Sequence, residues 1–136
     1  YWIEPTIFTD VTNDMRIARE EIFGPVMCVL RYSDLDEAIA QANDSIYGLS
    51  AGVWSKDYER AIEVGNRLRA GTVWINTWHG VDPNLPFGGF KQSGVGRELG
   101  PDALNEYTEA KHVHVDLSQT LDRQIFDILL SEPPSA

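Results

Sequence analysis

The sequence has very little cysteine and few positive charges. Cys28 is the only cysteine in 136 residues, which excludes an intrachain disulfide and favours a reducing compartment, so we expect a cytoplasmic protein. Lysine and arginine number 11 against 21 aspartates and glutamates, giving a formal net charge of -10. This balance argues against nucleic acid and against an anionic membrane surface as partners, because both require a basic face.

Long hydrophobic runs are also missing. No apolar stretch reaches the ~18 residues of a membrane span, and the first residues do not have the pattern of a signal peptide. The chain opens with the strand-like run "YWIEPTIF", without Met, and we expect it to be a piece of a longer protein. Its length and its 43% hydrophobic residues are nevertheless sufficient for one domain with a core of its own.

Strands and helices are predicted to alternate along the first 76 residues. Residues 26–32 ("VMCVLRY") form a nearly continuous apolar run, which is typical of a strand buried on both faces. Extended structure is also expected at 1–8, 49–55 and 72–76. Strands joined by helices through short connections predict an α/β fold with a mostly parallel sheet and flanking helices.

The helices are predicted from apolar stripes of helical period and from capping residues. Residues 33–45 have Ser33 or Asp34 as the expected cap. The second helix is expected to start at Ser55 and to end at Gly71. The side chains expected to face inward from it are Tyr58, Ala61, Ile62 and Leu68. Shorter helical turns are expected after Asn13 and at 101–109, where Pro101 suits a first turn.

A Gly/Pro-rich stretch of 25 residues (76–100) follows the last predicted strand. Loops of this length inside a domain are usually functional or disordered, and the aromatics and prolines of this one argue against disorder. It leaves the carboxyl end of a strand, where ligands of α/β sheets bind. Its part "LPFGGFKQSGVGRELG" (85–100) matches neither the dinucleotide fingerprint nor the P-loop, because the spacing of its glycines and lysine is wrong for both. The glycines are therefore expected to permit tight turns around Phe87 and Glu98 instead of binding phosphate.

The last part of the chain contains one more predicted strand. "KHVHVDL" (111–117) alternates with period two, as an edge or pairing strand does. His112 and His114 share a face of it, but further ligands are not evident, so a metal site is not expected. Residues 118–136 are amphipathic and then Pro/Ser-rich, which is typical of a mobile extension or a partner-binding helix.

Five stretches of the sequence stand in the order and spacing found near the end of NAD(P)-dependent aldehyde dehydrogenases, which the chain resembles from about residue 1 to 117. They are "EEIFGPV" (20–26), "YGLSAGVWSKD" (47–57), "GTVWIN" (71–76), "PFGGFKQSGVGRELG" (86–100) and "YTEAKHVHV" (107–115). The resemblance implies that residues 1–110 are the C-terminal part of the catalytic domain. It implies that 111–117 are a strand that pairs with a neighbouring subunit of a homo-oligomer. Residues 118–136 would be a C-terminal extension.

The resemblance also implies an activity, the oxidation of an aldehyde to a carboxylic acid with NAD or NADP. In the family a cysteine thiolate attacks the carbonyl, hydride leaves to the nicotinamide, and water hydrolyses the thioester. That nucleophile would lie outside this chain. Cys28 stands in an apolar strand, where a thiol is expected to be structural and inert. By itself the chain is therefore expected to be inactive.

Site residues follow from the same resemblance. Glu21 matches the glutamate that accepts hydrogen bonds from the nicotinamide ribose, and Phe23 would pack beside that ribose or the ring. Phe87 would flank the aldehyde, and Glu98 would be buried, with a raised pKa, in a relay of water and protons. The other residues implied to line the substrate tunnel are Trp78, His79 and Val81.

Plainer roles compete with these. Glu21 could be a solvated acid and Phe23 a core residue. Glu98 could form a surface ion pair with Arg97 or Lys91. Asn76, at the end of the last strand, could simply hold the long loop by bonding to backbone. For the whole chain, the alternatives are an inactive fragment or a non-catalytic assembly module.

Overall fold

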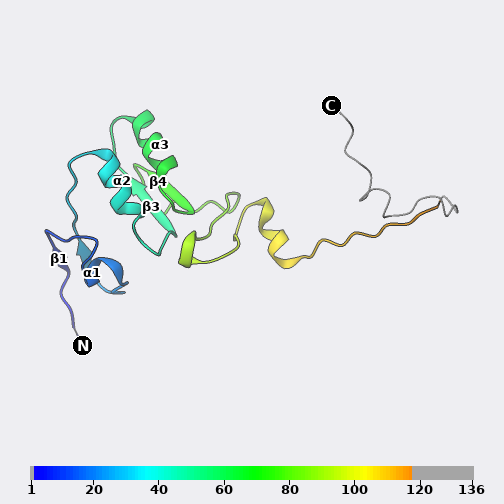
Figure 1. Ribbon diagram of the computed structural model, residues 1–136, viewed down its shortest axis with the longest axis horizontal. Coiled ribbons are helices and arrows are strands. Elements are labelled where there is room, and N and C mark those ends of the chain that lie inside the picture. Colours follow the sequence, from blue (N-terminus) through cyan, green and yellow to red (C-terminus); the bar gives the residue numbers. More distant parts are fainter. Residues whose placement is uncertain (1, 118–136) are drawn as a thin grey trace, which may run out of the picture.

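The computed structural model describes residues 2–117 (Figure 1). Two 3₁₀ helices, η1 and η2, follow an alternation of strands and helices. In chain order the elements are β1 (Thr6–Phe8), α1 (Arg16–Arg19), β2 (Val26–Cys28), α2 (Leu35–Asn43), β3 (Ser50–Val53), α3 (Tyr58–Arg67), β4 (Thr72–Ile75), η1 (Lys91–Ser93) and η2 (Pro101–Tyr107).

The strands form two separate parallel ladders, so the predicted α/β class with parallel pairing is confirmed. β1 pairs with β2, and β3 pairs with β4 with Ser50 opposite Thr72. The prediction of a long, doubly buried strand at 26–32 is wrong. β2 has only three residues, and Met27 is 53% exposed. Burial on both faces requires a layer on each side of a strand, and β2 has only β1 at one edge within residues 2–117.

A reciprocal cap begins α2. The Asp34 carboxylate accepts a hydrogen bond from the Glu37 backbone N–H at 2.9 Å, so Asp34, one of the two predicted residues, is the cap. The Glu37 carboxylate in turn accepts from the Ser33 hydroxyl at 2.6 Å and from the Ser33 N–H at 2.7 Å. The hydroxyl bond, and then the backbone bond, hold the pKa of Glu37 below its ordinary value.

α3 begins later than predicted. Its cap is Asp57, which accepts from the Arg60 N–H at 3.0 Å, while Ser55 accepts from the Asp57 N–H. Tyr58 and Ile62, expected to face inward, are 65% and 52% exposed, whereas Ala61 is 1% exposed. The side of α3 that faces β4 carries small residues, since Ala61 is buried and a Cβ on Gly65 would lie 3.4 Å from Val73 Cγ1. Small residues allow a helix to approach a strand closely, and the larger Tyr58 and Ile62 lie outside that contact.

The core lies where α3 packs on the β3–β4 ladder and α2 packs against α3 (Figure 1). Among residues 2–117, the buried apolar side chains are Val11, Ile39, Ala61 and Trp74. The end of α2 is tied to the end of α3, because the Asn43 amide donates to Arg67 O at 2.9 Å and accepts from the Arg69 N–H at 2.7 Å.

The glycine-rich loop runs from one end of the β3–β4 ladder to the other. It leaves the carboxyl end of β4 and returns to the residues that precede β3 and β4. There the Phe90 N–H donates to Gly48 O at 2.8 Å, and the Gly71 N–H donates to the same oxygen at 3.0 Å. A Cβ on Gly71 would lie only 1.7 Å from Gly88 O, so the loop can lie in this position only on a glycine.

The glycines of the loop act in two ways. Gly94, Gly96 and Gly100 have positive φ, as their predicted role in tight turns requires. Gly88 and Gly89 do not have positive φ, so the prediction of a special conformation there is wrong. What matters at Gly88 is close approach, because a Cβ would lie 2.7 Å from Gly96 O.

The end of the described chain carries no strand. η2 confirms the short helix that begins at Pro101, and residues 108–117 then run away from the body of the structure (Figure 1). The strand expected at 111–117 is not formed in this chain, since a strand exists only when a second one pairs with it. The amphipathic segment at 118–136 lies outside the described residues.

Replacing Gly71 by alanine should destabilise the protein strongly. The new methyl group would collide with the Gly88 carbonyl, and we expect a loss of roughly 3 kcal/mol in the free energy of unfolding. The matched control is Gly65→Ala in α3, where the Cβ would lie 3.4 Å from Val73 Cγ1 and helix propensity improves. Denaturant unfolding of the two variants is the measurement, and equal stabilities would contradict the close approach.

Candidate functional site

The predicted site residues fall into two groups at opposite ends of the β3–β4 ladder. At the carboxyl end, aromatic side chains form a cluster. The Trp78 ring stacks on Trp54 at 6.4 Å and lies edge-on to Trp74 at 5.0 Å, and His79 lies 5.7 Å from Trp74. Two of the predicted tunnel residues, Trp78 and His79, therefore pack together.

Asn76 ties the two strands together at this same end. Its side-chain oxygen accepts from the Ser55 N–H at 2.8 Å, and its NH₂ group donates to Ser55 O at 2.7 Å. The predicted backbone-binding role is confirmed, but the bound backbone is the one that follows β3, not the long loop. Asn76 has φ 55°, a conformation that asparagine tolerates better than most residues.

The second group lies at the amino end of the ladder. Phe87 and Glu98 form an isolated antiparallel bridge, in which each N–H donates to the other residue's carbonyl at 2.7 Å. Phe87 is half-buried. The expectation that Glu98 is buried is wrong, because its side chain is exposed; its carboxylate accepts a long hydrogen bond from the Tyr107 hydroxyl at 3.5 Å. The bridge nevertheless holds these two predicted residues next to each other.

The alternative ion pair of Glu98 is not formed either. Arg97 donates to Gly89 O at 3.0 Å and lies 5.2 Å over the Phe90 ring. Lys91 donates to backbone carbonyls at the end of α2. Both cations brace the loop instead of neutralising the carboxylate of Glu98.

Glu21 and Phe23 are both exposed. Phe23 is 92% exposed and has φ 54°, which excludes the core role that competed with cofactor contact. Glu21 lines a hollow of about 520 Å³, together with Tyr47, Leu49, Gln92 and Ser93. Its carboxylate is therefore placed beside the loop that carries Phe87 and Glu98.

A second hollow, of about 250 Å³, is lined by both Phe87 and Glu98. Leu49 and Ser93 line this hollow as well as the one beside Glu21, so the two are neighbours. The structure thus brings Glu21, Phe87 and Glu98 around one pair of residues. We call the two hollows together the Leu49/Ser93 site. Val81, which is exposed, lies in the stretch of loop between this site and the aromatic cluster.

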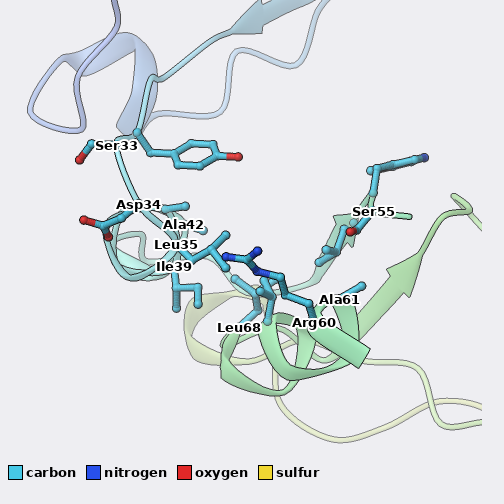
Figure 2. Close-up of a pocket in the computed structure, with 15 residues that line it drawn as sticks. Ser33, Asp34, Leu35, Ile39, Ala42, Ser55, Arg60, Ala61 and Leu68 are labelled. Atoms are coloured by element: carbon cyan, nitrogen blue, oxygen red, sulfur yellow. The ribbon is translucent and has the colours of Figure 1, made fainter. Parts of the chain in front are cut away.

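A larger hollow, of about 700 Å³, lies between α2 and α3 (Figure 2). Its walls are mostly aliphatic, and two of its polar residues, Ser33 and Asp34, are already engaged in the cap of α2. None of the residues predicted for the site lines it. Arg60, Ser55 and Tyr32 also line it, but size alone does not make it the candidate site.

Cys28 and the potential metal ligands of residues 2–117 do not add a further site. Cys28 is half-buried and its thiol donates to Ile17 O at 3.6 Å, as its structural role predicts. Across residues 2–117, His, Cys, Asp and Glu do not gather in groups of three that could hold a metal ion. In the same part of the chain, no helix has the length and apolar character needed to cross a bilayer.

Comparison with known proteins decides the family. The model of the aldehyde dehydrogenase family matches residues 1–113. The chain belongs to the aldehyde dehydrogenase family. It is 56% identical over 114 residues to the mitochondrial aldehyde dehydrogenase of Leishmania tarentolae, covering 84% of this chain and 23% of that protein. An aldehyde dehydrogenase of Agaricus bisporus is 56% identical over 118 residues, covering 87% of this chain and 24% of its own length.

Solved structures of aldehyde dehydrogenases resemble the chain equally well. A double mutant of betaine aldehyde dehydrogenase from Staphylococcus aureus, in complex with NAD⁺, has a TM-score of 0.85 at 48% identity, covering 89% of this chain and 24% of that one. The Mycobacterium tuberculosis aldehyde dehydrogenase complexed with NAD⁺ has a TM-score of 0.79 at 47% identity, covering 88% and 25%. The chain thus spans about a quarter of the length of the aldehyde dehydrogenases it matches.

Sequence reasoning missed several residues that line the site. Tyr47, Leu49, Gln92 and Ser93 were not predicted to belong to it, although Gln92 and Ser93 stand inside the quoted glycine-rich motif. Ser93 carries a visible signal, since a hydroxyl between glycines is suited to bond backbone, and it accepts from the Gly48 N–H at 2.9 Å. Leu49 carries no such signal, because only the folded chain places it beside Phe87.

Asn76→Asp tests the clasp between the strands. Aspartate tolerates the same left-handed conformation and can still accept from the Ser55 N–H, but it cannot donate to Ser55 O. We expect a loss of about 1–3 kcal/mol in the free energy of unfolding. Asn66→Asp on the exposed part of α3 should change it by less than about 0.5 kcal/mol. Equal effects in denaturant unfolding would show that the clasp does not contribute.

Proposed function

We propose that this chain is part of an NAD(P)-dependent aldehyde dehydrogenase that oxidises a small aldehyde to a carboxylic acid. The observation that carries the proposal is the convergence of Glu21, Phe87 and Glu98 on the Leu49/Ser93 site. Family membership supports it, as do the NAD⁺ complexes of related structures, which favour NAD as the cofactor. When bound, the nicotinamide accepts the hydride that the aldehyde loses.

Glu21 and Phe23 are the proposed cofactor contacts. The exposed carboxylate of Glu21 beside an open hollow can accept two hydrogen bonds from a ribose diol. The Phe23 ring projects almost wholly into solvent, which leaves a flat apolar face for the ribose or the nicotinamide ring. Both residues stand between α1 and β2, and Glu21 shares its hollow with Gln92 and Ser93 of the glycine-rich loop.

The substrate side of the site would be apolar. Phe87 offers a half-buried aromatic wall that suits an uncharged carbonyl compound. Trp78, His79 and Val81 would line the approach to that wall along the loop. Glu98, held to Phe87 by the backbone bridge, would pass a proton or orient water for hydrolysis of a thioester. The nucleophilic cysteine would lie outside this chain, since Cys28 is engaged with Ile17 O.

The assembly proposed for the protein is a homo-oligomer built through residues 111–117. Val113, Val115 and Leu117 are exposed and alternate along the segment, so a neighbouring subunit could pair with it by β-augmentation. A cytoplasmic location remains part of the proposal. The Leishmania tarentolae relative is named as mitochondrial, so the compartment of this protein is to be determined by its own experiment, such as cell fractionation.

A second candidate function is a non-catalytic assembly module. Wide exposure of large apolar side chains favours it, because Trp2 and Val95 are fully exposed and Phe23 is nearly so. Apolar surface of this kind usually marks an interface. The two candidates differ in one property, since only the dehydrogenase binds nicotinamide.

The first experiment measures the intact mass of the natural gene product and its NAD⁺-dependent oxidation of aldehydes. We expect an active polypeptide of about 50 kDa, a typical size for two or three domains. Glu21→Gln should raise the KM for NAD⁺ by roughly tenfold through a weakened ribose contact, whereas Glu59→Gln on α3 should leave it unchanged. A natural product of 136 residues that binds no nicotinamide would leave the assembly module as the function.

Glu98→Gln tests the relay. Glutamine keeps the shape of the side chain but cannot take up a proton, so thioester hydrolysis should slow by about 10²-fold while acylation changes little. Pre-steady-state kinetics should then show a retained burst of NADH followed by a slower steady state. Glu109→Gln, on the exposed segment after η2, is the control. Unchanged burst and steady-state rates in the Glu98 variant would exclude the relay.

A further inference from the structure

The ammonium group of Lys91 lies at the C-terminal end of α2. Its Nζ donates to Asn43 O and to Ser45 O, both at 2.9 Å, and the side chain is partly buried. The last turn of α2 contains no basic residue of its own. Carbonyl groups at a helix C-terminus lack partners within the helix and carry partial negative charge, so a cation there is stabilising. Asn43 O also accepts from the Ser45 N–H at 2.9 Å, and the ammonium adds a second bond to it. Lys91 supplies this cation from a distant part of the sequence.

Backbone hydrogen bonds on both sides of Lys91 reinforce the attachment of the loop to the end of α2. The Phe90 N–H donates to Gly48 O at 2.8 Å, and the Gln92 N–H donates to Ile46 O at 2.9 Å. Segment 90–93 is thereby laid along segment 43–48. These contacts leave Lys91 with φ 54°, a left-handed conformation that lysine rarely adopts and that the surrounding bonds must offset.

The attachment point is itself well braced. Asn43, whose carbonyl receives the Lys91 ammonium, also binds the backbone at the end of α3 through its side chain. The ammonium therefore acts at the place where α2 and α3 end and where the connections to β3 and β4 begin. If the Lys91 ammonium were displaced from these carbonyls, the glycine-rich loop would shift relative to α2, α3 and the β3–β4 ladder.

We propose that Lys91 is a positioning residue for the Leu49/Ser93 site. It stands between Phe87 and Glu98 in sequence but lines neither hollow, so it would act by holding the segment whose next residues, Gln92 and Ser93, form the wall beside Glu21. Loss of the ammonium would release that wall and loosen the Phe87–Glu98 bridge. The inference rests on the proposed dehydrogenase function, because it is in that reaction that these residues act.

The test uses the full natural enzyme with Lys91→Met, Lys91→Arg and the control Lys56→Met on the exposed turn before α3. Methionine keeps the unbranched stem and removes the donors. We expect the KM values for NAD⁺ and aldehyde to rise by roughly tenfold per folded active site, with a smaller change in kcat. Arginine, which retains the charge and several donors, should restore most of the loss. Lys56→Met should behave as wild type.

Hydrogen exchange of the peptide covering 85–100 gives a second readout that needs no substrate. The Phe87 and Glu98 amides, both bonded in the bridge, should exchange faster in Lys91→Met than in wild type. If Lys91→Met does not fold, Lys91→Gln takes its place, since one amide donor can still reach one carbonyl.

The outcomes separate the two proposals. Wild-type kinetics and unchanged exchange in a folded Lys91 variant would overturn the positioning role while leaving the dehydrogenase intact. A lower melting temperature with unchanged KM and kcat would also overturn it, because Lys91 would then be merely structural. An inactive wild-type enzyme that binds no NAD⁺ would refute the proposed function, and exchange would then report only on the loop.

Discussion

The arrangement of the molecule depends on one close approach, that of the Gly88 carbonyl to Gly71. A side chain at Gly71 would occupy the position of that oxygen, so the glycine-rich loop lies across the start of β4 only because none is present. From that contact the neighbouring backbone follows, with Phe90 and Gly71 both bonded to Gly48 O. The loop is thereby fixed to the two connections that precede β3 and β4, and the bonds of Lys91 to the end of α2 attach it further.

This constraint divides the long loop between the two ends of one ladder. Its first part remains at the carboxyl ends of the strands, where Trp78 and His79 pack on Trp74 and where Asn76 joins the strand ends. Its second part carries Phe87 and Glu98 to the amino ends, beside Leu49.

The exposed apolar surface of the described chain is consistent with its match to only part of longer aldehyde dehydrogenases. Phe23 and Val95 are exposed in the described chain, and the related aldehyde dehydrogenases are about four times longer than the stretch that matches. The conformations at Phe23 and Lys91 are both left-handed and both unusual for such side chains. Each stands within two residues of one that lines the Leu49/Ser93 site, Glu21 and Gln92. Strained backbone of this kind tends to gather at functional positions.

The sequence alone determined the α/β class, the approximate extent of α2 and its Asp34 cap. It also contains the motifs by which the chain is placed among aldehyde dehydrogenases. These depend on neighbouring residues, as capping and periodicity do. The start of α3, the exposure of Glu98 and the partners of Asn76, Arg97 and Lys91 came from the tertiary structure. The partners of Asn76 and Lys91 are decided by contacts between segments far apart in sequence, and no local pattern encodes which carbonyl a cation will reach. The start of α3 rests on neighbouring residues, but Ser55 and Asp57 both suit a cap, and the folded chain uses Asp57.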